Sequence, residues 1–205
     1  MRPTRTSASS RTVRLFIAIN LPADVRRLAH AAAAPLREAA PHAHWVAEEN
    51  LHLTLKFLGE VPEDAGPAIA AAVGAASACH RRTELELRDF GAFPNLRRPR
   101  VVWAGVLPDP RLELLQHDLE VACEGLGFEV EGRPFRPHVT LGRVKVAAAP
   151  EEVRALARAA RSARLHAACT VESVDVMRSD PSRDGARYSV LAALPLMPQS
   201  PLRSA

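Results

Sequence analysis

The chain contains few of the features that are typical of secreted or membrane proteins. Its 205 residues include three cysteines, Cys79, Cys123 and Cys169, which lie far apart and match neither a disulfide framework nor a Cys-Xaa-Xaa-Cys metal motif. No apolar run reaches the length of a transmembrane helix. We therefore expect a cytoplasmic protein in a reducing environment, with no membrane attachment.

Lysine is also scarce. Only Lys56 and Lys145 are lysines, so arginine supplies almost all of the 27 basic residues, and the formal net charge is +4. Arginine binds phosphate in a bidentate manner better than lysine does, although a GC-rich genome would also encode an arginine-rich protein. The mild positive excess is compatible with an anionic substrate but does not require one.

Length and hydrophobic content predict one folded domain. A chain of 205 residues with 47% hydrophobic residues can form one sizeable core or two small fused lobes. Residues 1–12 are rich in Arg, Ser and Thr and resemble a transit peptide, but nothing amphipathic follows them. We predict a disordered leader at residues 1–12, a single bilobal domain at residues 13–197, a tail at residues 198–205, and a monomer.

A short sequence occurs twice in the chain. His-Xaa-Thr-Leu begins at His52 and again at His138, 86 residues later. The same offset relates Leu21-Pro22 to Leu107-Pro108. Two tetrapeptides could match by chance, whereas a shared spacing of several landmarks indicates a duplicated unit. Two units related by an approximate two-fold axis would present the same strand twice to one cleft.

Each motif has the alternation of a half-buried strand. In an extended strand, alternate side chains share one side, so His52 and Thr54 would point into the cleft while Leu53 and Leu55 point into the core. The motif at His138 would behave likewise. A helix would separate the His and Thr of one motif by about 200°, which would destroy the pairing.

The order of predicted elements gives the fold class. Strands and helices alternate in two similar series, which predicts an α+β protein with two pseudo-symmetric lobes from a duplicated unit. Each lobe would be a small, mostly antiparallel sheet with outer helices, and the active cleft would lie between the lobes. The repeat units are predicted at about residues 14–99 and 100–196. Strands are expected at 14–19, 46–58, 83–90, 101–107, 133–144, 167–177 and 187–196, and helices at 22–39, 62–78, 109–125 and 150–163.

Together these residues resemble the 2H phosphoesterase superfamily, in particular the bacterial RNA 2′,3′-cyclic phosphodiesterases that are also called 2′-5′ RNA ligases. One His-Xaa-Thr sequence is a weak signal, but two with matching spacing and flanks are specific. The resemblance spans residues 14–196. Its matching segments are residues 14–22, 50–59, 91–94, 102–105, 133–143 and 185–188, together with Ser179.

The resemblance implies metal-independent hydrolysis of RNA 2′,3′-cyclic phosphate ends to 2′-phosphomonoesters, without a cofactor. It implies that His52 donates a proton and His138 accepts one, although the sequence alone does not orient the pair. Histidine suits both roles because its unperturbed pKa is about 6.5, so activity is expected to peak near neutral pH. Thr54 and Thr140 would donate hydrogen bonds to the non-bridging phosphate oxygens.

Arg143 is a further candidate for substrate binding, because the family pattern has an arginine at this position. Its odd offset from His138 puts it on the opposite side of a regular strand. A bulge or bend at Gly142 would bring it to the cleft side. The alternative role for Arg143 is an ion pair that joins the two lobes.

Several residues outside the motifs have more than one interpretation. His42 and His44 could join His52 in a metal site, but no carboxylate or cysteine completes the set, so no metal is predicted. The arginines of the loop at residues 91–99 and just after it form either a phosphate-binding patch or a solvated loop. These arginines are Arg97, Arg98 and Arg100. Three aromatic residues could either stack on a base or belong to the core: Trp45, Phe93 and Tyr188.

Three other functions would use the same cleft. One is 2′-5′ ligation of RNA through the same residues. Another is hydrolysis of a small cyclic nucleotide, and the third is non-catalytic binding of a nucleotide or an RNA end. The presence of both histidines and both threonines argues against the third, because binding alone needs no paired acid and base.

Overall fold

A computed structural model describes residues 11–144, 148–182 and 185–199 of the chain. The strands are β1 (Thr12–Asn20), β2 (His44–Trp45), β3 (His52–Pro62), β4 (Thr83–Phe93), β5 (Val101–Val106), β6 (His138–Arg143), β7 (His166–Val171), β8 (Ser173–Ser182) and β9 (Gly185–Pro195). The α-helices are α1 (Ala23–Ala32), α2 (Ala34–Ala39), α3 (Gly66–Ser77), α4 (Pro110–Glu124) and α5 (Pro150–Ser162), and two 3-10 helices are η1 (Glu48–Asn50) and η2 (Glu63–Ala65).

The described strands form one sheet of nine strands in the order β7-β4-β5-β6-β3-β1-β8-β9, with β2 paired to β6. All of these pairs are antiparallel. The sheet has the same arrangement on either side of the boundary between β6 and β3. We call β3, β1, β8 and β9 the first half-sheet, and β6, β5, β4 and β7 the second half-sheet.

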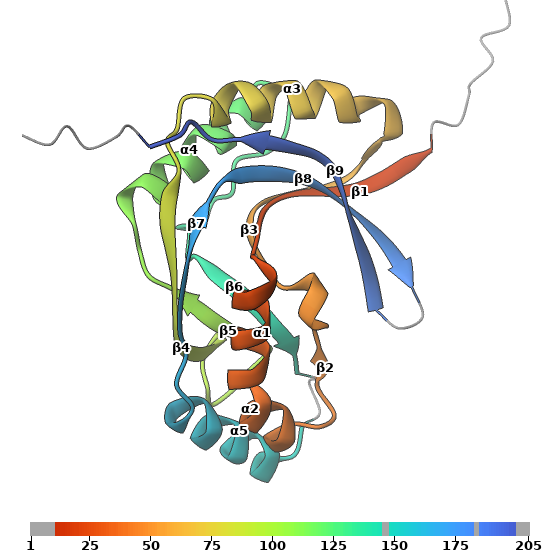
Figure 1. Cartoon of the computed structure of the whole chain (residues 1–205). Helices are drawn as coiled ribbons and strands as arrows, with labels where there is room; N and C mark the ends of the chain where they lie inside the picture. Colours follow the sequence, from red (N-terminus) through yellow and green to blue (C-terminus); the bar gives the residue numbers. More distant parts are fainter. Residues whose placement is uncertain (1–10, 145–147, 183–184, 200–205) are drawn as a thin grey trace, which may run out of the picture.

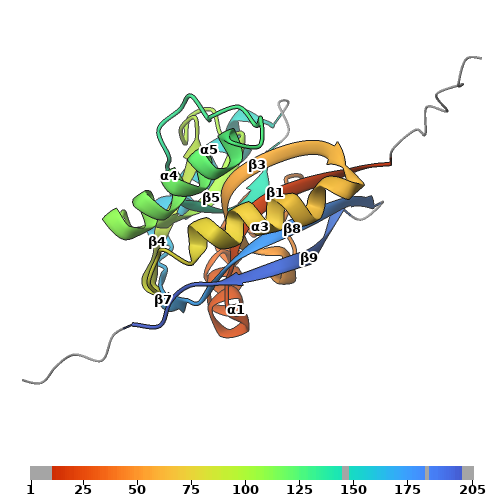
Figure 2. The same cartoon turned by 90° about the horizontal axis from the view of Figure 1, so that it is seen from above.

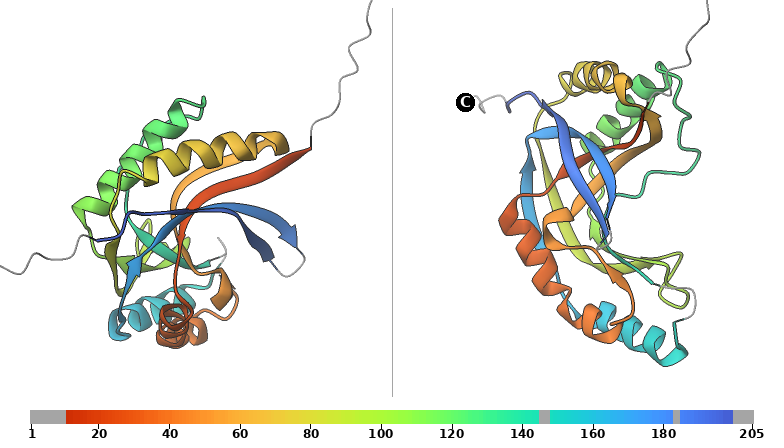
Figure 3. Two further views of the ribbon diagram at one scale, coloured as in Figure 1. Left: turned by 45° about the horizontal axis from the view of Figure 1, so that its top comes forward. Right: turned by 90° about the vertical axis from the view of Figure 1, so that its right-hand side faces the viewer.

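The predicted α+β class with two similar halves is confirmed, and one detail of it is wrong. The sequence predicts two separate small sheets, whereas β3 and β6 join the two half-sheets through the pair Leu53 and Val139. The join is narrow, since only this one residue pair is in register between the two strands. The sheet is curled, and its helices lie on the outer side of the curl (Figure 3).

The half-sheets do not coincide with the predicted repeat units. Strand β4 pairs with β5, and β8 pairs with β1, so each half-sheet contains strands from both halves of the sequence. This exchange also explains why the predicted strand at 167–177 is two strands. Glu172 separates β7, which is at one edge of the sheet, from β8, which is next to the strand at the other edge.

Two groups of helices cover the outer side. Helices α3 and α4 pack on each other and cover the first half-sheet, whereas α1, α2 and α5 cover the second (Figures 1 and 2). The sequence predicts one helix over 22–39, but the helix breaks at Ala33. Pro35 explains the break, because proline has no N–H to donate to the preceding turn and its ring clashes with that turn.

The core lies between the sheet and these helices. Leu53, Leu55, Val139 and Leu141 are all buried in it, which confirms the predicted inward direction of the aliphatic residues of both motifs. The strand predicted at 133–144 begins only at His138, because Pro134 and Pro137 cannot donate hydrogen bonds to a neighbouring strand.

The predicted leader and tail lie mostly outside the described residues. Residues 1–10 and 200–205 are not described, while Thr12 already belongs to β1. At the other end, the backbone N–H of Met197 donates to the carbonyl of His80 (2.8 Å). Among the residues that the structure describes, no helix has the length and hydropathy of a membrane span.

Candidate active site

Both predicted histidines begin strands at the join between the two half-sheets. His52 is the first residue of β3 and His138 is the first residue of β6. The antiparallel pair Leu53 and Val139 brings His52 toward Thr140 and His138 toward Thr54, on one side of the sheet. The structure therefore brings the two motifs together, as their spacing predicts.

The alternation of burial within each motif is regular. His52, Thr54, His138 and Thr140 are half-buried, whereas the aliphatic residues between and after them are buried. Within the described part of the chain, neither threonine hydroxyl has a hydrogen-bond partner in the protein. Both hydroxyls can therefore donate to a molecule in the cleft.

The backbone holds both imidazole rings in the same way. The Nδ1 atom of His52 lies 2.7 Å from the carbonyl oxygen of Asn50, and the Nδ1 atom of His138 lies 2.7 Å from the carbonyl oxygen of Arg136. A carbonyl can only accept, so Nδ1 carries the proton in each neutral ring. Each Nε2 has no hydrogen-bond partner among the described residues. It can therefore accept a proton from a molecule in the cleft or, after protonation, donate one to it.

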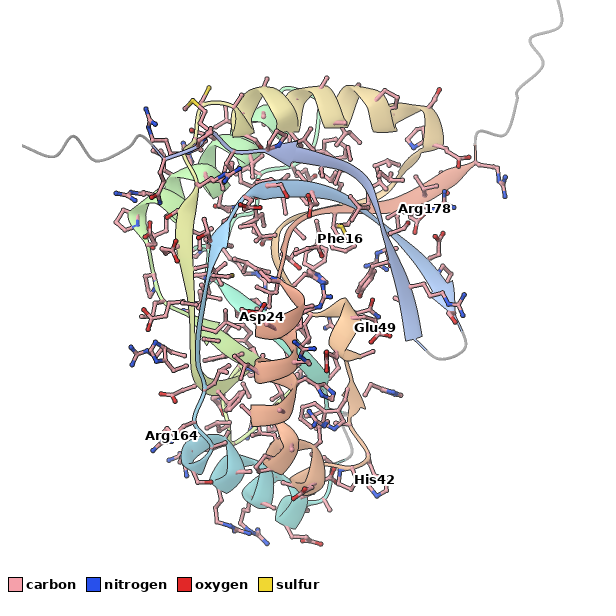
Figure 4. The ribbon with its side chains drawn as sticks, viewed as in Figure 1. Phe16, Asp24, His42, Glu49, Arg164 and Arg178 are labelled. Carbon is pink, nitrogen blue, oxygen red and sulfur yellow. The ribbon has the colours of Figure 1, made fainter. Side chains whose placement is uncertain are left out.

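Aromatic rings support each histidine from the side. His52 packs against Phe16 and Tyr188, with ring centroids 5.0 Å and 5.2 Å away. His138 packs against Phe93 with the centroids 4.9 Å apart and the planes at 88°, and Phe93 in turn contacts Trp103. Figure 4 shows Phe16 at the centre of the molecule, beneath β8. Of the aromatic residues considered for base stacking, Tyr188 and Phe93 thus contact the histidines.

Burial lowers the pKa of both histidines below its usual value. For His52, the carbonyl of Asn50 opposes this effect and the charge of His138 adds to it. For His138, the carbonyl of Arg136 opposes it and the positive charge of Arg143 adds to it. A positive charge on His138 lowers the pKa of His52, so protonation of one ring disfavours protonation of the other.

A bulge brings Arg143 to the cleft side of β6. In the register of β5 and β6, Trp103 is opposite Thr140 and Val101 is opposite Arg143, so β6 has one extra residue at this point. Trp103 and Val101 point to the same side of β5, and Arg143 therefore shares a side with Thr140. The bulge that a cleft-facing Arg143 requires is thus present.

The matching bulge in β3 brings Phe57 to the same side of the sheet. Ala18 is opposite Thr54 and Phe16 is opposite Phe57, so β3 also has one extra residue after its threonine. Phe57 is thus the counterpart of Arg143 in the first half-sheet. Its side chain is 63% exposed, although it is large and apolar. Phe57 is not among the predicted site residues, and the signal that could have found it is its offset of 86 residues from Arg143.

The bulge also turns Lys56 to the side opposite the cleft. There Lys56 is buried and forms an ion pair and hydrogen bond with Glu120 of α4. Its Nζ atom also donates to the carbonyl of Glu129 (2.8 Å), and the N–H of Glu131 donates to Glu120 (3.3 Å). This network connects the strand that begins with His52 to the segment that leads to His138.

A pocket of about 320 Å³ lies beside His52. Asn20, which is opposite His52 on β1, donates a hydrogen bond to the buried Asp175 of β8 (2.7 Å). Sequence patterns do not predict Asn20 or Asp175 as site residues, because their position near His52 depends on the pairing of β1 with both β3 and β8. The pocket is lined by Asn20, Arg26, Glu49, Asn50, His52, Asp175, Met177, Tyr188 and Val190.

The alternative metal site at His42, His44 and His52 is not assembled. Figure 4 places His42 at the lower end of the molecule, well away from Phe16, and Phe16 contacts His52. His44 lies on β2, opposite Arg143. Among the residues that the structure describes, no group of three or more His, Cys, Asp or Glu side chains could hold a metal ion.

Comparisons with known proteins agree with this geometry. The model of the 2′-5′ RNA ligase superfamily matches residues 22–183. An RNA 2′,3′-cyclic phosphodiesterase of Geobacillus stearothermophilus is 34% identical over 184 residues, which are 89% of this chain and 57% of that protein. A protein of the same name from Aeropyrum pernix is 44% identical over 103 residues, which are 49% of this chain and 56% of that protein. The chain thus spans little more than half the length of these relatives.

A solved structure has the same fold. E. coli LigT complexed with 3′-AMP superimposes with a TM-score of 0.72 and 31% identity, over 91% of this chain and 99% of that chain. The chain belongs to the 2′-5′ RNA ligase superfamily, whose members are 2H phosphoesterases.

Proposed function

We propose that the protein hydrolyses the 2′,3′-cyclic phosphate at the end of an RNA to a 2′-phosphomonoester. The observation that carries this proposal is the pair of histidines, each with its Nδ1 held by a backbone carbonyl and its Nε2 free on one side of the sheet. The names of the relatives support the choice of substrate.

In the proposed reaction, neutral His138 takes a proton from water through Nε2. The water oxygen forms a new bond to phosphorus while the bond between phosphorus and the 3′ oxygen breaks. Protonated His52 gives its Nε2 proton to the departing 3′ oxygen, so the products are a 2′-phosphate and a free 3′ hydroxyl. His52 is then neutral and His138 protonated, and exchange with solvent restores the starting state.

The other cleft residues would act on the phosphate and the nucleoside. Thr54 and Thr140 would donate hydrogen bonds to the non-bridging oxygens, whose negative charge increases in the transition state. Arg143 would contact the same oxygens from the side of His138. Phe57 is exposed on the same side of the sheet as Thr54 and could stack on a base. No step in this mechanism uses a metal or a cofactor.

The test is product analysis with a short RNA that ends in 2′,3′-cyclic phosphate, in the presence of EDTA. We expect a 2′-phosphate to form, and we expect the His52→Ala and His138→Ala variants to leave the RNA unchanged. Formation of a 3′-phosphate would place the cleaved bond on the 2′ oxygen. Joined RNA products would favour ligation, and binding without any product would favour a non-catalytic module.

We also propose that the protein acts as a monomer in the cytoplasm. Its cysteines Cys79, Cys123 and Cys169 are free, which is compatible with a reducing compartment. Light scattering on the purified protein tests the oligomeric state, and a mass twice that of one chain would contradict the proposal.

A further inference from the structure

A second concave site lies outside the cleft, on the second half of the molecule. It is a groove of about 750 Å³ between helix α5 and the loop that joins β4 to β5. Figure 3 (right) shows this loop and α5 at the lower end of the molecule. Six arginines line the groove, three from the loop and three from the helix: Arg97, Arg98, Arg100, Arg154, Arg158 and Arg161.

The charges of this arginine groove are largely uncompensated. All six side chains are exposed, and none of the described residues that line the groove is acidic. Within the described residues, only Arg154 has a carboxylate within 4.0 Å, that of Glu151 at 3.8 Å. An exposed ion pair of this kind contributes little stabilising free energy, so Arg154 can still bind another anion.

The fold itself does not require these arginines. Helix α3 is the counterpart of α5 in the first half, and its sequence from Gly66 to Ser77 contains no charged residue. On α5, Arg154, Arg158 and Arg161 are spaced by four and three residues, so they lie on one side of the helix, while Leu156 and Ala160 are buried. An arginine-rich composition would distribute charge over both helices, whereas here the charge is on one helix and on the adjacent loop.

The groove is connected to the cleft through a short stretch of backbone. The loop begins after Phe93, whose ring packs against His138. Its other end is fixed by Arg100, whose N–H donates to the carbonyl of Phe93 (2.7 Å) and whose carbonyl accepts from the N–H of Val144 (3.0 Å). The loop therefore has one end beside His138 and lines the groove with its three arginines. It is the route that we infer for an RNA whose end lies at His138.

We propose that the arginine groove binds the phosphodiester backbone of the RNA strand whose cyclic phosphate end lies in the cleft. This inference rests on the proposed function. Guanidinium groups bind phosphate oxygens in a bidentate manner, and their spacing along α5 provides several contacts that do not depend on base sequence. The groove would then make the enzyme prefer an RNA over a cyclic mononucleotide.

The test compares two substrates and two double variants. The substrates are a nucleoside 2′,3′-cyclic phosphate and an RNA of about 12 nucleotides with the same end, a length chosen to provide several phosphate contacts. The variant Arg154→Gln/Arg158→Gln removes two charges from the groove. The matched control is Arg27→Gln/Arg111→Gln, which removes two exposed charges from α1 and α4 and leaves the groove intact.

We expect the groove variant to lose about 10-fold in kcat/KM for the RNA, and to keep its kcat/KM for the mononucleotide. The dependence of log kcat/KM on log salt should become shallower by about 0.7 for each phosphate that the variant no longer neutralises, as for single strands. The control should behave like the wild type with both substrates. Equal losses in the groove variant and the control, or equal kcat/KM of the wild type for both substrates, would overturn the proposal.

A binding measurement separates this inference from the proposed function. Fluorescence anisotropy with the same RNA ending in a 2′-phosphate measures the affinity of the groove for RNA, because this RNA cannot be turned over. If the wild type hydrolyses neither substrate, the proposed function fails, and the groove is still judged by whether the groove variant binds this RNA more weakly than the control does. Equal binding by the two variants would refute the groove.

Discussion

The two halves of the molecule use the same backbone to hold different side chains. His52 and His138 each begin a strand, each donate Nδ1–H to the carbonyl two residues earlier, and each precede a bulge after the threonine. After the bulge, the first half presents Phe57 and the second presents Arg143. The outer helices differ in the same sense, since α3 has no charge and α5 is rich in arginine.

The symmetric backbone and the side chains that differ between the halves have separate roles in the proposed reaction. A symmetric backbone suits a reaction that needs one proton acceptor and one proton donor on opposite sides of a phosphorus atom. The proposed substrate is not symmetric, because it has a base and a chain on one side of the phosphate. The side chains that differ between the halves are therefore the ones that we expect to recognise the RNA.

The largest effect is expected from the two histidines. His52→Ala and His138→Ala should each lower kcat by roughly 10²–10⁴ because each removes one proton transfer. The double variant should lose far less than the product of the two single losses, since the pair acts as one unit. Single-turnover kinetics measure this, with circular dichroism as the control for folding. Near-normal turnover in either folded single variant would break the proposed pairing.

The threonines come next. Thr54→Val and Thr140→Val keep the β-branched shape but remove the hydroxyl, so each should reduce kcat by about 10- to 1000-fold, the scale of one missing transition-state hydrogen bond. If the halves are functionally equivalent at this position, the two losses will be similar. Thermal unfolding should change little because both side chains are only half-buried and have no partner in the described structure. A large loss of stability with unchanged kcat would assign them to the fold instead.

Substitution of Arg143 or Phe57 should lower activity less than substitution of the threonines, and the two variants should differ in which kinetic constant changes. Arg143→Gln removes a charge-assisted hydrogen bond of about 1.5–3 kcal/mol and should lower kcat/KM even for a cyclic mononucleotide. Phe57→Ala removes a stacking interaction of about 1–3 kcal/mol and should act mainly on KM. Leu114→Ala, at a 55% exposed position on α4, is the matched control for removing exposed apolar surface. Identical behaviour of the Phe57 and Leu114 variants would remove the base-stacking role.

The smallest expected effect is on pH dependence. A lowered pKa means that each ring binds its proton less tightly, so the singly protonated pair is most populated on the acid side of the usual histidine pKa of about 6.5. The profile of kcat/KM, which reports the free enzyme, should therefore peak below neutral pH, lower than the sequence alone predicts. The profile of kcat should lie at higher pH, because a bound phosphate anion favours the protonated ring. Coincident profiles that peak above pH 7 would contradict this.

The centre of the site can be predicted from the sequence more completely than its surroundings can. Alternation within each His-Xaa-Thr-Leu motif determines which side chains face the cleft, and the shared offset indicates that the strands lie together. The position of Arg143 on the cleft side requires a bulge in β6. The sequence indicates that such a bulge is needed, but it does not show that the bulge is present. Asn20 and Asp175 were missed, because their position beside His52 depends on strand pairing between residues more than 150 apart. The exchange of β4 and β8 between the half-sheets has no local signal either.

We propose that the two equivalent histidines have opposite roles, with His52 as the acid and His138 as the base. A cyclic phosphate substrate with sulfur in place of the 3′ oxygen distinguishes these roles, because a thiolate leaves without being protonated. We predict that this substrate restores turnover in His52→Ala and not in His138→Ala, measured as the release of free thiol. Rescue of His138→Ala alone, or of neither variant, would contradict the assignment.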